Sequence, residues 1–323
     1  RGAAAFDVKV RGTFKNPSIE GQVKVAEGSV VDIPFHNLSA KVRYQDQNVF
    51  VKDLRIQVFG GQAEGEAAVA ADNLSYTAHV KASGIDMGML SEVVPQAAVV
   101  TGKVTADMGV SGVGISMDQL QAYGGAKLEN GSYGALPIEN INTSFYLAGD
   151  NLQLDFLSVN LPNHSRLAAE GTITGLTTAP KLDLAYYGAH FDLSLLQKVE
   201  PKADVTGLSD FKGTVQGDWD NPQVVIKFSG LKGTLFKQPF DSLKLTASGS
   251  LDGVHIDDFL MEKNGKEVWR VAGSVGFAGE RKIDLQIDTM GARMEDIAAL
   301  VAPDQPITGN VDNIIKFTGT LDN

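Results

Sequence analysis

Apolar and polar residues alternate along much of the chain, which is the pattern of strands with one buried side and one side facing water. The clearest case is the segment 282–288, where Ile283, Leu285 and Ile287 alternate with charged or polar residues. Apolar pairs at the same spacing recur elsewhere: Val49 and Val51, Leu152 and Leu154, Leu182 and Leu184, Val254 and Ile256. The pattern predicts an all-β fold of antiparallel strands, and it makes these eleven residues the candidates for one continuous apolar face.

Short clusters of Asp, Asn and Gly separate the alternating runs, as at residues 72–73, 149–151, 252–253 and 264–265. Such clusters are typical of the tight turns of antiparallel hairpins and meanders. The Gly-rich run 109–114 does not have the spacing of a phosphate-binding loop, and no helical pattern follows it. We therefore interpret this run as another hairpin turn.

Three sequence marks return at a nearly constant interval. Gly12 opens the motif G-T-F-K-N-P, which returns at Gly217 and begins again at Gly319, with a degenerate copy at Gly112. A second mark is a Gly-Ser or Gly-Thr step, followed six residues later by a proline; these prolines, at 34, 137 and 239, are 103 and 102 positions apart. The third mark is a helical candidate that ends at a proline before a Thr-Gly step: residues 87–94, 192–199 and 294–301.

The marks divide the chain into tandem repeats of one unit. We predict the end of a preceding repeat at 1–11, three repeats at 12–111, 112–216 and 217–318, and the start of a further repeat at 319–323. Each repeat is expected to hold about eight short strands and one short helix. Both ends of the chain are expected to lie inside a longer protein.

Composition narrows the class of function. The net charge of −11 would repel a phosphate backbone, so we expect no nucleic-acid partner. The absence of cysteine excludes disulfides and thiolate metal sites, and no apolar run is long enough to span a bilayer. The five histidines are scattered singly, without convergent partners: His36, His79, His164, His190 and His255. We predict no catalytic site, no metal and no cofactor, and hence no enzyme.

An apolar face this long has to be covered, because exposing it to water is unfavourable. Too few helical segments are predicted to do so. A second sheet, a sheet curled onto itself, and an apolar guest remain open as solutions, and the alternation of residues does not distinguish them.

The order of the repeat marks resembles the repeats of the TamB family, within the wider AsmA-like group of bacterial envelope proteins. The resemblance covers essentially the whole chain, although the second repeat lacks the Asn-Pro step at Gly112. It implies a long antiparallel sheet curled into an open trough with an apolar concave face, a β-taco, with one short helix per repeat. The implied function is a segment of an envelope-spanning hydrophobic groove that conducts phospholipids between the inner and outer membranes.

The resemblance also implies partners and a location. Phospholipid acyl chains would lie on the eleven residues of the apolar face, which become lipid-lining residues. An outer-membrane protein like TamA or BamA would dock through a C-terminal region outside this chain. The protein would lie in the periplasm of a diderm bacterium, tethered to the inner membrane by a segment that is also outside this chain.

Two other functions remain open. The sheet could act as a scaffold for assembly of outer-membrane proteins, in which a free edge pairs with a client strand by β-augmentation. Alternatively, the chain could be a structural surface repeat whose apolar residues fill a closed sandwich core.

Overall fold

The structure is a computed structural model of the 323-residue chain, and it describes residues 4–13, 16–30, 33–91, 99–293 and 308–320. The described residues form 19 strands in an open antiparallel sheet that is not closed into a barrel. The predicted all-β antiparallel fold class is therefore confirmed. No helix among the described residues is long and apolar enough to cross a membrane.

The chain divides into two compact units, which are described separately. Unit 1 comprises residues 1–160 and 174–177, and unit 2 comprises residues 161–173 and 178–323. These units are not the predicted sequence repeats, since the boundary near residue 160 falls inside the second repeat.

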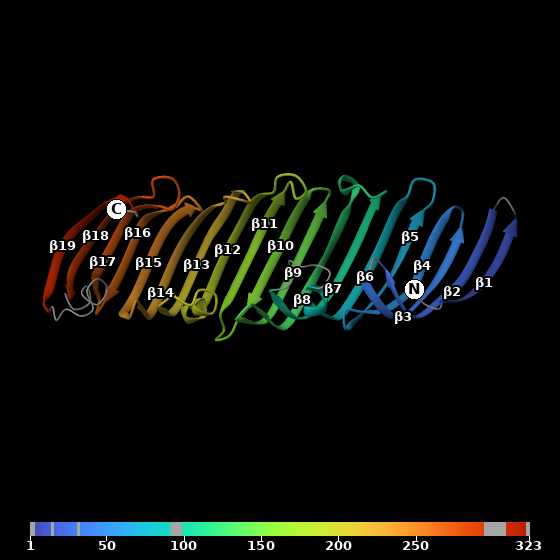
Figure 1. Cartoon of the computed structure of the whole chain (residues 1–323), viewed down its shortest axis with the longest axis horizontal. Coiled ribbons are helices and arrows are strands. Elements are labelled where there is room, and N and C mark those ends of the chain that lie inside the picture. Colours follow the sequence, from blue (N-terminus) through green and yellow to red (C-terminus); the bar gives the residue numbers. More distant parts are fainter. Residues whose placement is uncertain (1–3, 14–15, 31–32, 92–98, 294–307, 321–323) are drawn as a thin grey trace. The chain divides into compact units, whose positions relative to one another are not determined.

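Ten strands belong to unit 1, and each pairs antiparallel with its neighbour in the sequence (Figure 1). They are β1 (Ala4–Thr13), β2 (Asn16–Val30), β3 (Ile33–Gln45), β4 (Asn48–Val58), β5 (Gly61–Ala70), β6 (Ser75–Asp86), β7 (Val100–Val113), β8 (Gln121–Tyr133), β9 (Leu136–Ala148) and β10 (Asn151–Asn160). A helical turn, α1 (Met87–Ser91), follows β6, and a 3-10 turn, η2 (Met117–Gln119), lies between β7 and β8.

Unit 2 begins with β11 (Arg166–Thr174), whose last residue is assigned to unit 1. A meander of eight strands follows: β12 (Lys181–Asp192), β13 (Val205–Asp218), β14 (Gln223–Leu235), β15 (Gln238–Ser250), β16 (Gly253–Lys263), β17 (Lys266–Gly276), β18 (Lys282–Arg293) and β19 (Asn310–Thr320). The 3-10 turn η3 (Leu193–Lys198) packs at the start of β13 (Figure 1).

The expected number of strands per repeat is wrong. Equivalent Thr-Gly steps lie at the start of β7 and of β13, so a repeat contains six strands, not eight. The strands are 9 to 15 residues long, and several contain a β-bulge that interrupts the alternation. In β4 the register shifts between Val51 and Leu54, and in β12 between Gly188 and Phe191. A bulged strand therefore resembles two short strands in the sequence.

Other local predictions have mixed outcomes. The turns expected at 72–73, 149–151, 252–253 and 264–265 lie at hairpin connections. The run 109–114 is not a hairpin turn, because β7 continues to Val113 and the turn begins only at Gly114. Helical turns occur within two of the three candidate segments, as α1 and η3, while the candidate at 294–301 lies outside the described residues.

The described strands all belong to one open sheet, and no second sheet is present among them. The accessible surface of the chain is 19843 Å², whereas a compact monomer of 34.3 kDa would expose about 13,000 Å². A closed sandwich core, one of the solutions left open by the sequence, is therefore not the arrangement of the described residues.

Candidate apolar binding face

Antiparallel pairing brings apolar residues of successive strands into rows that run across each unit. Directly paired residues lie on the same face of the sheet, so the strand register identifies the members of each row. We call the side that carries these rows the apolar face and the other side the polar face.

In unit 1 one such row crosses all ten strands with one small or apolar residue from each. It consists of Val8, Gly21, Val42, Val51, Ala67, Ala78, Val110, Ala122, Leu147 and Leu152. Val49 lies one row to one side, paired with Tyr44 and Val69. Leu154 lies one row to the other side, paired with Phe145. The four candidate residues of unit 1 thus share one face.

In unit 2 three adjacent rows cross all eight strands from β12 to β19. Row 1 consists of Leu184, Val215, Val224, Gly249, Val254, Val275, Ile283 and Gly319. Row 2 consists of Tyr186, Gly213, Ile226, Ala247, Ile256, Gly273, Leu285 and Phe317. Row 3 consists of Gly188, Phe211, Phe228, Leu245, Phe259, Val271, Ile287 and Ile315.

Six of the seven candidate residues of unit 2 belong to these rows, and the seventh, Leu182, lies one step beyond row 1, opposite Gly217. All eleven candidates are half-buried, although no described layer lies over them. Apolar surface therefore remains available to a guest.

Alternation in the sequence missed many members of the rows. Glycine and alanine occupy positions such as Ala67, Ala78, Gly249 and Gly273, where a small residue does not register as an apolar one. Bulges hid others, because they change which residues point to a given face. Only the pairing of strands identifies the glycines as members of the rows, and this pairing cannot be predicted from the sequence of a single strand.

Several glycines lie directly opposite an aromatic residue on the neighbouring strand. Tyr186 is paired with Gly213, and its hydroxyl donates a hydrogen bond to the carbonyl oxygen of Val225 at 3.1 Å. A Cβ atom on Gly213 would lie 2.6 Å from the Tyr186 hydroxyl. The Tyr186 ring thus lies across the glycine and along the sheet, so it projects little from the apolar face. This packing also fixes the register of the two strands. Burial raises the pKa of the Tyr186 hydroxyl.

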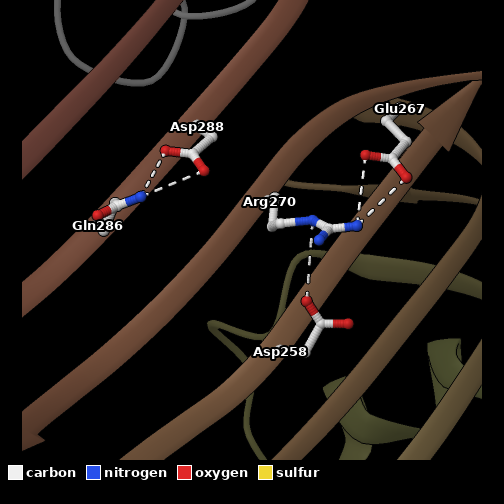
Figure 2. A network of polar contacts seen from close by, with 5 residues as sticks. All are labelled: Asp258, Glu267, Arg270, Gln286 and Asp288. Carbon is white, nitrogen blue, oxygen red and sulfur yellow. Dashed lines mark hydrogen bonds and ion pairs between the residues drawn. The ribbon is translucent and has the colours of Figure 1, made fainter.

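The polar face carries exposed ion pairs. In unit 2, Arg270 on β17 lies 3.9 Å from Asp258 and donates hydrogen bonds to Glu267 (Figure 2). Gln286 on β18 donates to Asp288 at 3.0 and 3.3 Å. Exposed pairs of this kind contribute little to stability, but they keep this face in water.

A hollow of about 650 Å³ lies over β1 to β4 on the polar face of unit 1. It is lined by paired charges: Lys41 with Asp53 at 2.7 Å, and Arg43 with Glu20 at 3.5 Å. The hydrogen bond from Lys41 lowers the pKa of the Asp53 carboxyl group. The lining is thus polar and carries charges of both signs, unlike the rows of the apolar face.

The five histidines lie far apart in the sequence, and four of them are exposed. The fifth, His79, is partly exposed and pairs with Asp107, and this hydrogen bond lowers the pKa of that carboxyl group. Among the residues that the structure describes, no group of three His, Asp or Glu side chains could hold a metal ion.

Comparison of the chain with family models, with curated proteins and with solved structures finds no match.

Proposed function

We propose that this chain is a segment of a hydrophobic groove that conducts phospholipids, with their acyl chains in contact with the apolar face. The observation that supports the proposal is the continuity of the rows, which cross every strand from β1 to β10 in unit 1 and from β12 to β19 in unit 2. A cargo that slides needs a continuous lining, because a deep individual pocket would hold it in one place.

The energetics favour an acyl guest. Removing apolar surface from water contributes about 0.8 kcal/mol for each CH₂ group. Most residues of the rows are half-buried or exposed, so both the guest and the lining would lose contact with water on binding. The ion pairs of the opposite face, such as those of Arg270, would stay hydrated.

Following the resemblance to TamB-family repeats, we propose that this groove lies in the periplasm of a diderm bacterium. It would form part of a trough that bridges the inner and outer membranes, tethered to the inner membrane and docked to an outer-membrane protein like TamA or BamA. The trough, its concave apolar face, the location and the docking partner all belong to the proposal.

The test is photo-crosslinking in cells that produce the protein. A photoreactive residue replaces Leu285, which lies in row 2, and the matched control replaces Asp284, the next residue, whose side chain is exposed on the polar face. Mass spectrometry of the adducts should find phospholipid at position 285 and none at position 284.

Other outcomes would support the competing functions. If position 285 crosslinks only to its own chain, the apolar face is a packed core and the chain is a structural repeat. If neither position captures lipid and proline substitutions in a free edge strand abolish activity, assembly by β-augmentation is supported instead.

A further inference from the structure

The two edges at which the strands of unit 2 end differ in burial. The hairpin edge contains the turns β13–β14, β15–β16 and β17–β18. The capped edge contains η3 and the turns β14–β15 and β16–β17. The rows of the apolar face lie between these two edges and run parallel to them. The two ends of each strand therefore have different surroundings, which gives the face a direction along the strands.

The hairpin edge presents a large exposed apolar side chain at each of its three turns. The exposed fractions are 58% for Trp219, 70% for Leu251 and 51% for Phe277. Hydrogen bonds join the turns: the Asn221 side chain accepts from the Leu251 amide at 3.0 Å, and the Phe277 amide donates to the Asp252 carbonyl oxygen at 2.7 Å. These side chains are therefore held out from the ends of the strands by an ordered framework.

The capped edge is closed by a packed cluster. Phe240, Leu243 and Met261 are 3%, 5% and 4% exposed, and Phe228 and Trp269 pack against them. Leu243, Met261 and Trp269 are paired across β15, β16 and β17, so they form the row next to row 3. An apolar guest on the face would meet a wall of side chains at this edge.

The distance between the edges suits one leaflet of lipid. From Val275 in row 1 to Trp269 at the cluster is six residues along β17, or roughly 20 Å at about 3.4 Å per residue. The hydrocarbon of one leaflet is about 15 Å thick, half of a 30 Å bilayer core. An acyl chain parallel to the strands would therefore fit between the hairpin edge and the cluster.

In unit 1 the burial of apolar side chains also differs between the two ends of the strands. At its hairpin turns, Leu74 and Ile115 are exposed. Toward the opposite ends of its strands, Phe35, Leu128 and Ile138 are buried. Large exposed apolar side chains also occur at the capped edge, as at Phe236 in the β14–β15 turn (56% exposed), so the buried side chains are what distinguish the two edges in both units.

We propose that cargo lipids lie across the sheet, with acyl chains parallel to the strands, headgroups in file along the hairpin edge and chain ends against the cluster of the capped edge. This inference rests on the proposed function, and it adds which edge the headgroup occupies. Trp219, Leu251 and Phe277 would contact the glycerol region, where one end of an aromatic ring is apolar and the other is in water.

The two tryptophans of the chain lie at opposite edges of unit 2, which permits a direct test. Trp269→Phe leaves Trp219 as the only reporter at the hairpin edge, and Trp219→Phe leaves Trp269 as the only reporter at the cluster. Each variant is titrated with two zwitterionic phosphatidylcholine probes, one with a nitroxide on the headgroup and one with bromines near the ends of the acyl chains. Zwitterionic probes suit this edge because it carries charges of both signs, as in the pair of Lys181 with Asp218 at 3.8 Å.

The headgroup nitroxide should quench most of the emission of Trp219 and little of that of Trp269, and the bromines should show the reverse. Suppose that the bromines quench, but the nitroxide quenches Trp269 as much as Trp219 or more. The proposed orientation is then wrong, while the proposed apolar groove is still supported. If neither probe quenches either tryptophan, the proposed function fails together with the inference.

Discussion

Thr206 and Thr234, on neighbouring strands β13 and β14, lie with their hydroxyl oxygens 2.8 Å apart. Thr206 belongs to the Thr-Gly step and Thr234 to the Gly-Thr step, two marks that are separate in the sequence of each repeat. The same contact joins the preceding pair of repeats, between Thr101 and Ser132, also at 2.8 Å. The two marks therefore recur together because they form one contact.

The first prediction concerns this contact. The Thr206 hydroxyl also accepts a hydrogen bond from the Thr234 amide at 3.0 Å in a partly buried position. Thr206→Val keeps the volume and removes the acceptor, so it should lower the free energy of unfolding by about 1–2 kcal/mol. Amide hydrogen exchange at Thr234 should accelerate, while exchange at distant strands stays unchanged. Unchanged exchange at Thr234 would contradict the role of the contact.

The second prediction concerns the glycine of the same step. Gly207 has a φ of +117°, and a Cβ atom there would lie 3.0 Å from the Cα of Gly233. Gly207→Ala combines backbone strain with a collision against backbone, so it should cost about 2–3 kcal/mol. Gly265→Ala is the matched control: its φ is +69° and nothing lies within 4 Å of the added Cβ, so only about 1 kcal/mol should be lost. Denaturant unfolding of both variants measures the difference, and equal losses would exclude the collision.

Much of the fold follows from the sequence. Alternation in segment 282–288 correctly identifies the face of β18, and all eleven candidate residues lie on an apolar face of their own unit. The strand count failed at bulges such as that near Asp53, whose φ is +52°, because a bulge shifts the alternation within one strand. The glycines of the rows also escaped notice, since their membership depends on which strands pair.

The third prediction tests whether the apolar face is open. Leu243 is 5% exposed in the capped-edge cluster, whereas Leu285 is half-buried in row 2 with no described layer above it. Leu243→Ala should lower the free energy of unfolding by about 3 kcal/mol, and Leu285→Ala by only about 1 kcal/mol. Denaturant titrations followed by Trp269 emission would measure both. A loss as large at Leu285 as at Leu243 would mean that the face is covered.

The fourth prediction concerns acid stability. Asp192 precedes η3; partial burial opposes its ionisation, but hydrogen bonds from Ser194 and Asn163 to the carboxylate outweigh this, so its pKa is lowered below the usual 3.8. A carboxyl group whose pKa is lower in the folded state contributes stability above the unfolded pKa, and loses it as the pH falls through the folded value. Asp192→Asn should therefore be destabilising at neutral pH, and the difference should shrink as the pH falls below the usual pKa of 3.8. The unfolding midpoint of both proteins between pH 2 and 7 tests this, and a difference that does not depend on pH would refute it.

The last prediction concerns the repeated Asn-Pro step, which supports the turns of the hairpin edge. Asn221 joins two turns, since its side chain donates to the Asp252 carboxylate at 2.6 Å and accepts from the Leu251 amide. Asn221→Ala should release the turn and cost about 1–2 kcal/mol, with lower fluorescence anisotropy of Trp219 in the Trp269→Phe background. Asn221→Asp places a second carboxylate against Asp252, so its cost should exceed that of alanine at neutral pH and shrink as the carboxylates are protonated. If Asn221→Asp behaves like alanine at every pH, the contact with Asp252 does not hold the turns together, and the order of the hairpin edge has another source.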